Sequence, residues 1–116
     1  MFWKEKRIVI GLIESITLEN GVTYKAKIDT GADSSSIDQN LLEKLGEKKI
    51  LSHKFVKSAL GRTKRPTVRL EVEFQGKKFS EKFSVADRSH LRYKILIGKD
   101  ILKKEGFIID PIKENK

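Results

Sequence analysis

The segment from Pro66 to Phe74 limits the possible folds most strongly, because its apolar and polar residues alternate without a break. Val68, Leu70, Val72 and Phe74 recur at every second position, and charged residues stand between them. Side chains alternate between the two faces of a β-strand, so this pattern predicts a strand with one face in a core and the other in water. Such a strand requires partner strands, and the neighbouring segments supply them.

Further extended segments, separated by turn residues, precede and follow this strand. β-Branched residues dominate residues 7–18, and Asn20-Gly21 predicts a type I′ hairpin turn into a return strand over residues 22–28. After Phe74, the glycine-containing triplet at residues 75–77 predicts a second turn. The other expected strands cover residues 53–60, 78–85, 93–97 and 107–109, and a polar turn is expected at Gly61–Lys64.

Two short segments have the character of helices. Residues 38–45 carry three leucines on one side, with Ser36 or Asp38 available as the N-cap and Gly46 as the stop. The second helix is expected over residues 99–105. The whole order therefore predicts an all-β fold, compatible with a small closed barrel, with one or two short helices.

The chain is short and strongly charged, and 116 residues predict a single domain over residues 1–116. Its apolar runs fall well short of the ~20 residues that span a membrane, and it has no cysteine, so we expect a cytoplasmic protein without disulfides or thiolate chemistry.

The net charge of +9 attracts anions such as acidic protein or nucleic acid, although it also fits a simply solvated surface. Few aromatic residues stand among the basic ones, which disfavours stacking-type binding of nucleic acid.

The segment Asp29–Asp33, which reads D-T-G-A-D, directly follows the predicted strand over residues 22–28. A carboxylate at a strand end, beside a glycine and small residues, stands where other groups can approach it. The hydroxyl of Thr30 can hold the loop, and Ala32 leaves room beside the carboxylate. Taken alone, the triplet also fits a strand followed by an ordinary Asx turn, with Ser34–Ser36 as turn formers.

A second segment agrees with the first. Residues 95–102 read I-L-I-G-K-D-I-L, which is an apolar strand, Gly98, a charged pair and the start of a helix. Together the two motifs resemble the retropepsin-like aspartic proteases, and the resemblance runs from about residue 22 to residue 109. Finer features resemble the RimB-like branch, often labelled "ATP-dependent zinc protease", whose members are linked to enzymes that ligate glutamate onto proteins; these features are Lys27–Ala32, Arg65-Pro66, Asp87–Ser89 and Phe107–Pro111.

The resemblance implies a retropepsin-like barrel in which Asp29 is the catalytic acid, and Thr30, Gly31, Ala32 and Gly98 support its loop. An aspartic protease needs two neighbouring carboxylates, one ionised to activate water and one protonated to polarise the scissile carbonyl. This chain has one D-T-G, so the second carboxylate is expected from a second copy in a homodimer. Thr30 is then expected to hydrogen-bond across the dimer.

The hairpin around residues 61–64 takes the place of the flap in this comparison. Its basic residues are expected to attract an acidic substrate, and the expected substrate-binding residues are Asp33, Gly61, Arg62, Lys64 and Arg65. The predicted function is an aspartic peptidase that hydrolyses acidic, glutamate-rich segments and needs no cofactor. The alternative is a non-catalytic binding module of the same fold, whose basic face holds acidic protein or nucleic acid.

A zinc enzyme is the last alternative, because of the label that the branch carries. The two histidines, His53 and His90, are far apart in sequence, and the chain has neither an H-E-x-x-H motif nor a cysteine pair. Catalytic zinc usually needs three nitrogen, sulfur or oxygen ligands at suitable spacing, so no metal site is predicted. Lys99 also stands where the family usually has arginine, and lysine cannot form the same bidentate pairs.

Overall fold

The computed structural model describes residues 7–58 and 61–114, and the strands of this part form two sheets. Two of its elements are helices, α1 (Gln39–Glu43) and α2 (Lys99–Glu105), and the rest are strands. The strands are β1 (Val9–Ile10), β2 (Ile13–Thr17), β3 (Thr23–Ile28), β4 (Ser36–Asp38), β5 (Ser52–Ser58), β6 (Gly61–Phe74), β7 (Lys77–Ala86), β8 (Ile95–Ile97) and β9 (Ile108–Ile109).

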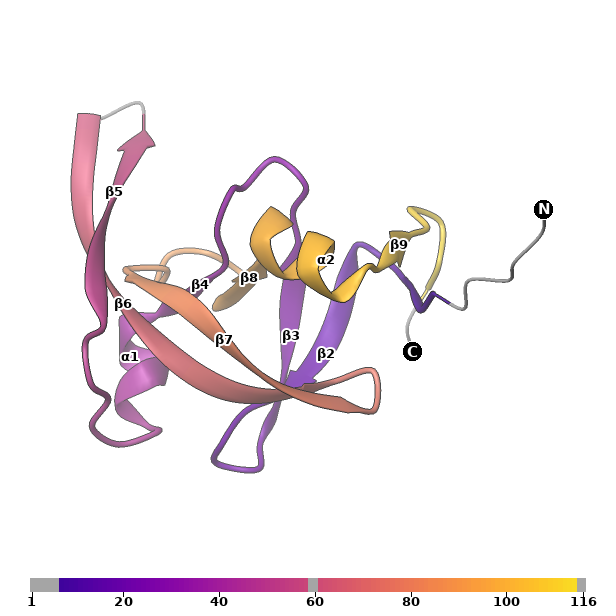
Figure 1. Cartoon of the computed structure of the whole chain (residues 1–116), viewed down its shortest axis with the longest axis horizontal. Coiled ribbons are helices and arrows are strands. Elements are labelled where there is room, and N and C mark those ends of the chain that lie inside the picture. The colour runs from indigo at the N-terminus through magenta and orange to yellow at the C-terminus, as the bar shows by residue number, and fades with distance from the viewer. Residues whose placement is uncertain (1–6, 59–60, 115–116) are drawn as a thin grey trace.

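The larger sheet closes on itself. Its strand order is β2-β3-β8-β4-β7-β6-β5, and Thr17 of β2 also pairs with Glu73 of β6, which joins the ends of a six-stranded ring. The start of β6 continues beyond the ring and pairs with β5, so the two form a projecting hairpin that we call the β5–β6 arm (Figure 1). This arrangement confirms the prediction of an all-β fold with two short helices.

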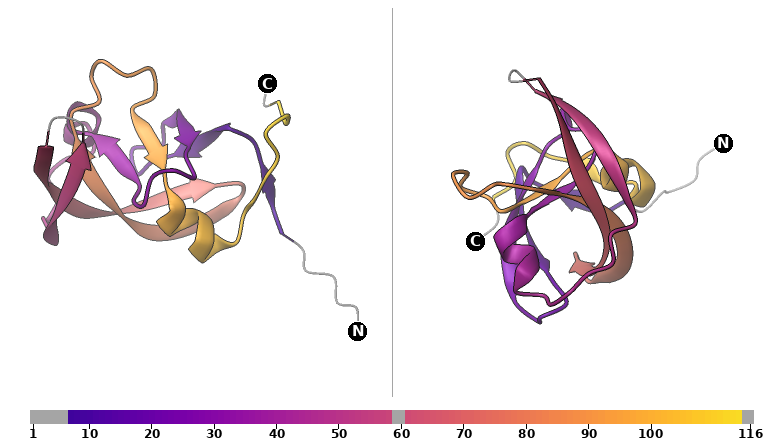
Figure 2. Two further views of the ribbon diagram at one scale, coloured as in Figure 1. Left: turned by 90° about the horizontal axis from the view of Figure 1, so that it is seen from above. Right: turned by 90° about the vertical axis from the view of Figure 1, so that its left-hand side faces the viewer.

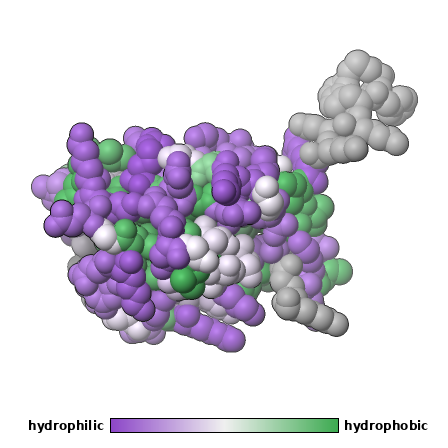
Figure 3. Space-filling model, turned by 90° about the horizontal axis from the view of Figure 1, so that it is seen from below, coloured by the Kyte–Doolittle hydropathy of each residue, from purple (hydrophilic) through white to green (hydrophobic). Residues whose placement is uncertain are grey.

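The inside of the ring is filled by the apolar faces of its strands. Val68, Leu70, Val72 and Phe74 are buried and the residues between them are exposed, which confirms the alternation seen in the sequence. The Phe74 ring meets that of Phe107 edge to face, with centroids 5.0 Å apart, a favourable arrangement for aromatic pairs. Charged and polar side chains cover most of the outer face seen in Figure 3, and hydrophobic ones form separate small areas.

The predicted turn at Asn20-Gly21 has a different construction from the one expected. The type I′ turn at Asn20-Gly21 is wrong, because only Gly21 has a positive φ (75°), and its backbone N donates to Leu18 O at 2.9 Å. The loop is therefore a three-residue connection that ends in a left-handed glycine. Positive φ at two successive residues occurs instead at Gln75 (54°) and Gly76 (76°), which connect β6 to β7.

The polar turn predicted at Gly61–Lys64 is also wrong, since all four residues belong to β6. Gly61 pairs with Ser58 and Lys64 pairs with Phe55 across the arm. Residues 59–60, which include the predicted end of the strand at residue 60, lie outside the described residues. The start of β6 is polar on both faces, so it lacks the alternation that would have revealed it as a strand.

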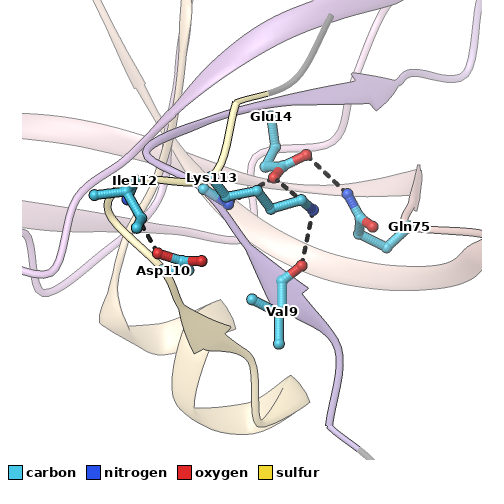
Figure 4. A network of polar contacts seen from close by, with 7 residues as sticks. Val9, Glu14, Gln75, Asp110, Ile112 and Lys113 are labelled. Carbon is cyan, nitrogen blue, oxygen red and sulfur yellow. Dashed lines mark hydrogen bonds and ion pairs between the residues drawn. The ribbon is translucent and has the colours of Figure 1, made fainter.

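The N-terminal segment divides into two strands, β1 and β2, and β1 pairs in parallel with β9 in the smaller sheet. A buried carboxylate, Glu14, stabilises this junction. It accepts hydrogen bonds from Gly11 N (2.6 Å) and Gln75 Nε2 (2.8 Å), and it lies 3.4 Å from Lys113 Nζ (Figure 4). Because Lys113 also donates to Val9 O at 2.9 Å, the first and last segments of the described part are both joined to the ring.

The first helix, α1, is shorter than predicted, whereas α2 has the predicted bounds. Asp38 occupies the N-cap position of α1 without a side-chain cap, because its Oδ1 accepts the backbone N–H of Arg88 at 2.7 Å. Ser36 lies in β4 and is two residues too early to cap the helix. Gly46, with φ of 88°, follows shortly after the helix, in agreement with its predicted role as the stop.

Candidate active site

Asp29 lies at the carboxyl end of β3, in the loop that leads to β4. Its backbone N donates to Ile97 O at 2.9 Å, which continues the parallel pairing of β3 with β8. Its Oδ1 accepts the N–H of Gly31 at 2.8 Å, so the side chain is held in an Asx turn. The carboxylate of Asp29 is therefore at a strand end, as the sequence predicts, in a fixed orientation and only half buried.

The two sequence motifs meet beside this loop. Lys99 N donates to Ala32 O at 2.8 Å, and Figure 2 shows α2 next to the β3–β4 loop. A Cβ atom on Gly98 would lie only 2.8 Å from the carbonyl oxygens of Ala32 and Ser34. Since real Cβ atoms do not approach backbone that closely, only glycine fits at position 98, and the contact fixes the loop against the helix.

Two further residues, Ser35 and Asp100, support the Asp29 loop, and the sequence alone did not identify them. Ser35 is fully buried, and its Oγ donates to Asp100 Oδ1 at 2.7 Å. The same Oγ accepts the N–H of Gly98 at 2.9 Å, and Ser35 N lies 3.1 Å from both carboxylate oxygens of Asp100. Hydrogen bonds to a charged group are stronger than neutral ones, so this network is a main stabiliser of the loop.

An ion pair closes the outer side of the same loop. Lys99 Nζ lies 2.9 Å from Asp33 Oδ1, and both side chains are exposed. The hydrogen bond from Lys99, together with its charge, holds the pKa of Asp33 below its ordinary value. Thr30 and Gly31 are exposed at the tip of the loop, where a second protein chain could reach them.

The residues predicted to bind substrate fall into two groups. Gly61, Arg62 and Lys64 are exposed on the β5–β6 arm, and Arg65 follows them half buried. The Arg62 guanidinium lies 4.5 Å from the centre of the Phe55 ring, a cation–π distance. In Figure 1 the arm and the β3–β4 loop rise on the same side of the molecule. Asp33 belongs to the loop and not to the arm, and it forms its ion pair with Lys99 of α2.

Within residues 7–58 and 61–114, the side chains of histidine, aspartate and glutamate form no group of three that could hold a metal ion. His53 lies exposed on β5 and His90 lies exposed in the β7–β8 loop. A helix long and apolar enough to cross a membrane is also absent from this described part.

The closed ring of strands, with a loop at the end of β3 that packs on the helix after Gly98, is a retropepsin-like fold. EIAV protease, solved with an inhibitor, matches it with a TM-score of 0.67 and 19% identity, over 92% of this chain and 95% of that one. Simian foamy virus protease matches with a TM-score of 0.60 and 19% identity, over 78% and 91%. A Legionella pneumophila protein of unknown function matches with a TM-score of 0.70 and 22% identity, over 93% and 96%.

A match to a protein-family model identifies the family to which the chain belongs. Residues 38–115 match the model of the RimB-like family, described as retropepsin-like aspartic endopeptidase RimB, and the chain belongs to this family. The protein is thus placed among the aspartic proteases, a class of hydrolases, as its sequence motifs predict. The matched segment begins after the D-T-G triplet and does not include Asp29, so the geometry of the Asp29 loop is evidence independent of the family match. The search of curated proteins gave no match.

Proposed function

We propose that the protein is an aspartic peptidase that works as a homodimer, with the Asp29 carboxylates of the two copies at one shared site. The observation that carries the proposal is the position of Asp29. It stands at a strand end, in a loop fixed by Gly98 and by the Ser35–Asp100 network, in a chain of an aspartic endopeptidase family. A loop fixed in this way keeps the carboxylate in place without reorganisation during the reaction.

The chemistry requires the two carboxylates to share one proton. Like charges at short distance cannot both ionise, so one Asp29 is ionised and the other is protonated. The ionised carboxylate takes a proton from water as the water oxygen attacks the peptide carbonyl carbon. The protonated carboxylate gives its proton to the carbonyl oxygen. Collapse of the resulting diol breaks the C–N bond and delivers a proton to the leaving amine.

Homodimerisation follows from the presence of one D-T-G in the chain. A two-fold axis beside the β3–β4 loop brings each residue near the axis against its own copy. Thr30 and Gly31 are exposed on that loop, so its tip is free to make the contact, and the Thr30 hydroxyl can donate a hydrogen bond across it. The two Asp29 carboxylates, one from each copy, then meet at the axis, and no other acidic residue of the chain is needed.

The substrate we propose is an acidic, glutamate-rich protein segment. Arg62, Lys64 and Arg65 lie close together at the start of β6 on the β5–β6 arm, on the side of the molecule where the Asp29 loop rises. Their charges raise the local concentration of anions, and salt screens this attraction over ~8 Å at physiological ionic strength. A cytoplasmic location fits a chain without cysteine.

The test is hydrolysis of a glutamate-rich peptide by the wild-type protein and by Asp29→Asn. We expect cleavage by the wild type only, with both proteins folded by circular dichroism, because asparagine has nearly the same shape but cannot accept the proton. Arg62→Glu with Lys64→Glu should raise the KM for this peptide more than for a neutral one. Cleavage by Asp29→Asn at the wild-type rate would remove Asp29 from the mechanism.

The alternative function, a binding module with the same fold, is favoured by the exposed Phe55–Arg62 pair on the basic arm, which resembles a contact surface more than a closing flap. On this alternative, wild type and Asp29→Asn bind an acidic peptide or single-stranded DNA equally, and neither cuts peptides. Calorimetry of both proteins beside the cleavage assay separates the two functions.

A further inference from the structure

The β7–β8 loop contains a buried arginine whose charge is not paired. Arg88 is 9% exposed, and its Nε donates to Tyr93 O at 3.0 Å. Within residues 7–58 and 61–114, the remaining four N–H donors of its guanidinium have neither a hydrogen-bond partner nor a carboxylate at ion-pair distance. Since these nitrogens are not fully buried, they are accessible to an anion from outside the protomer, and a carboxylate could pair with them there.

The loop that carries Arg88 is rigid. Its backbone N donates to Asp38 Oδ1 at 2.7 Å, which fixes it to the end of β4. Lys94 Nζ donates to the carbonyl oxygens of Arg88 (3.1 Å), Ser89 (2.8 Å) and Leu91 (2.6 Å). These three hydrogen bonds from one ammonium group hold the loop backbone in place. A guanidinium held on such a frame loses little conformational freedom when it binds a ligand.

The strand order brings the Arg88 loop close to both the arm and the strand that follows the active-site loop. Arg88 follows β7, which pairs with β4, the strand that leads out of the Asp29 loop, and with β6, whose start carries Arg65. Burial lowers the pKa of Arg88, the neighbouring charge of Arg65 on the arm lowers it further, and the charges of Asp38 and Asp29 oppose both effects. Among the described residues, no carboxylate, Asp29 included, lies at ion-pair distance from the guanidinium. Arg65 and Arg88 together make this side of the site strongly attractive to an anion.

We propose that Arg88 is a specificity-determining residue that binds the side-chain carboxylate of an acidic substrate residue next to the scissile bond. The planar fork of arginine matches a carboxylate with two parallel hydrogen bonds, which lysine cannot reproduce. This inference rests on the proposed peptidase function and deepens it. The arm attracts acidic peptides at long range, whereas Arg88 recognises one carboxylate by direct contact.

High salt separates the two contributions, because it screens exposed charges far more than a buried pair. The experiment compares kcat/KM for a short glutamate peptide with that for its glutamine counterpart, at low and at high salt. The wild type should keep a preference for glutamate of about tenfold or more at high salt, as expected for a charge-assisted hydrogen bond. Arg88→Gln should lose this residual preference, and Arg88→Lys should keep only a part of it.

The control is Arg92→Gln, which removes the same charge from an exposed position of the same loop, where the guanidinium lies over Tyr93. It should leave the high-salt preference unchanged. If Arg88→Gln fails to fold, Arg88→Lys still tests the proposal, because it keeps the charge and loses only the fork. An unchanged glutamate preference in folded Arg88→Lys and Arg88→Gln would overturn the inference, and so would an equal loss of activity on both peptides, which indicates a positioning role alone.

Binding to the Asp29→Asn protein keeps this test independent of catalysis. Calorimetry at high salt should show tighter binding of the glutamate peptide than of the glutamine peptide, and Arg88→Gln in the same background should abolish the difference. Should the wild type cut neither peptide, the peptidase proposal fails, while the calorimetry still reports whether Arg88 binds the carboxylate. If Asp29→Asn binds the glutamate peptide and the glutamine peptide with equal affinity, with or without Arg88→Gln, the Arg88 proposal is contradicted.

Discussion

Replacing the buried serine of the active-site loop, Ser35→Ala, should destabilise the protein far more than the loss of one surface hydroxyl. The substitution removes the 2.7 Å hydrogen bond to Asp100 Oδ1, and it removes the acceptor of the Gly98 N–H, which stays buried. A hydrogen bond to a charged group contributes about 1.5–3 kcal/mol, and an orphaned buried donor costs about 1–3 kcal/mol. Because Asp100 regains some water, we expect a loss of about 3 kcal/mol in the free energy of unfolding.

The assay is urea unfolding at one fixed protein concentration, since the stability of a dimer depends on concentration. With a slope of about 2 kcal/mol per molar urea, the expected loss lowers the midpoint by about 1.5 M. The matched control is Ser34→Ala, at the neighbouring, half-exposed position, which should shift the free energy by less than about 0.5 kcal/mol. Equal midpoints for the two variants would refute the assignment of the Ser35–Asp100 network as a main stabiliser.

Three further predictions concern the same fold and site. Gly98→Ala should destabilise the protein by about 1–3 kcal/mol and impair cleavage, because its Cβ would meet backbone atoms at 2.8 Å, whereas Lys103→Ala on the same helix should do neither; thermal melts and kinetics decide. For Glu19, burial raises the pKa, but the hydrogen bonds from Lys48 and Glu71 N and the charge of Lys48 together lower it below its ordinary value. A lowered pKa means stability that is present at neutral pH and lost as the pH falls through the folded-state pKa, so Glu19→Gln should weaken the protein at pH 7, and in urea titrations this difference should shrink as the pH is lowered into the acidic range. A chelator should leave the cleavage rate unchanged, because the described residues offer no metal site, and a zinc-reversible loss would favour the metal enzyme instead.

The parts of the fold that were predictable from the sequence depend on local patterns. The alternation from Pro66 to Phe74 reports burial directly, since each residue's face is set by its own position in the strand. The placement of Asp29 at the end of β3 follows from the run before it, and α2 follows from its apolar spacing and from Gly98. These features need no knowledge of which distant segments meet.

Apart from the local turn at Asn20-Gly21, the main errors and omissions concern contacts between distant segments. Ser35 looks like a turn former because its partner Asp100 is 65 residues away, and only the folded chain brings them together. Asp38 looks like a helix cap, but Arg88 N, 50 residues later, takes its carboxylate. The start of β6 is polar on both faces because the β5–β6 arm extends beyond the core, so composition identified it as a turn.

The central claim, that two copies share one site, is tested most directly by adding inactive subunits to active ones. A fixed amount of wild-type protein is equilibrated with increasing amounts of Asp29→Asn, and cleavage of a glutamate peptide is measured. Exchange converts active dimers into mixed dimers that hold only one ionisable Asp29, so activity should fall toward zero as the inactive protein comes into excess. Activity that stays constant over the whole titration, with subunit exchange verified by a labelled copy, would contradict the shared site.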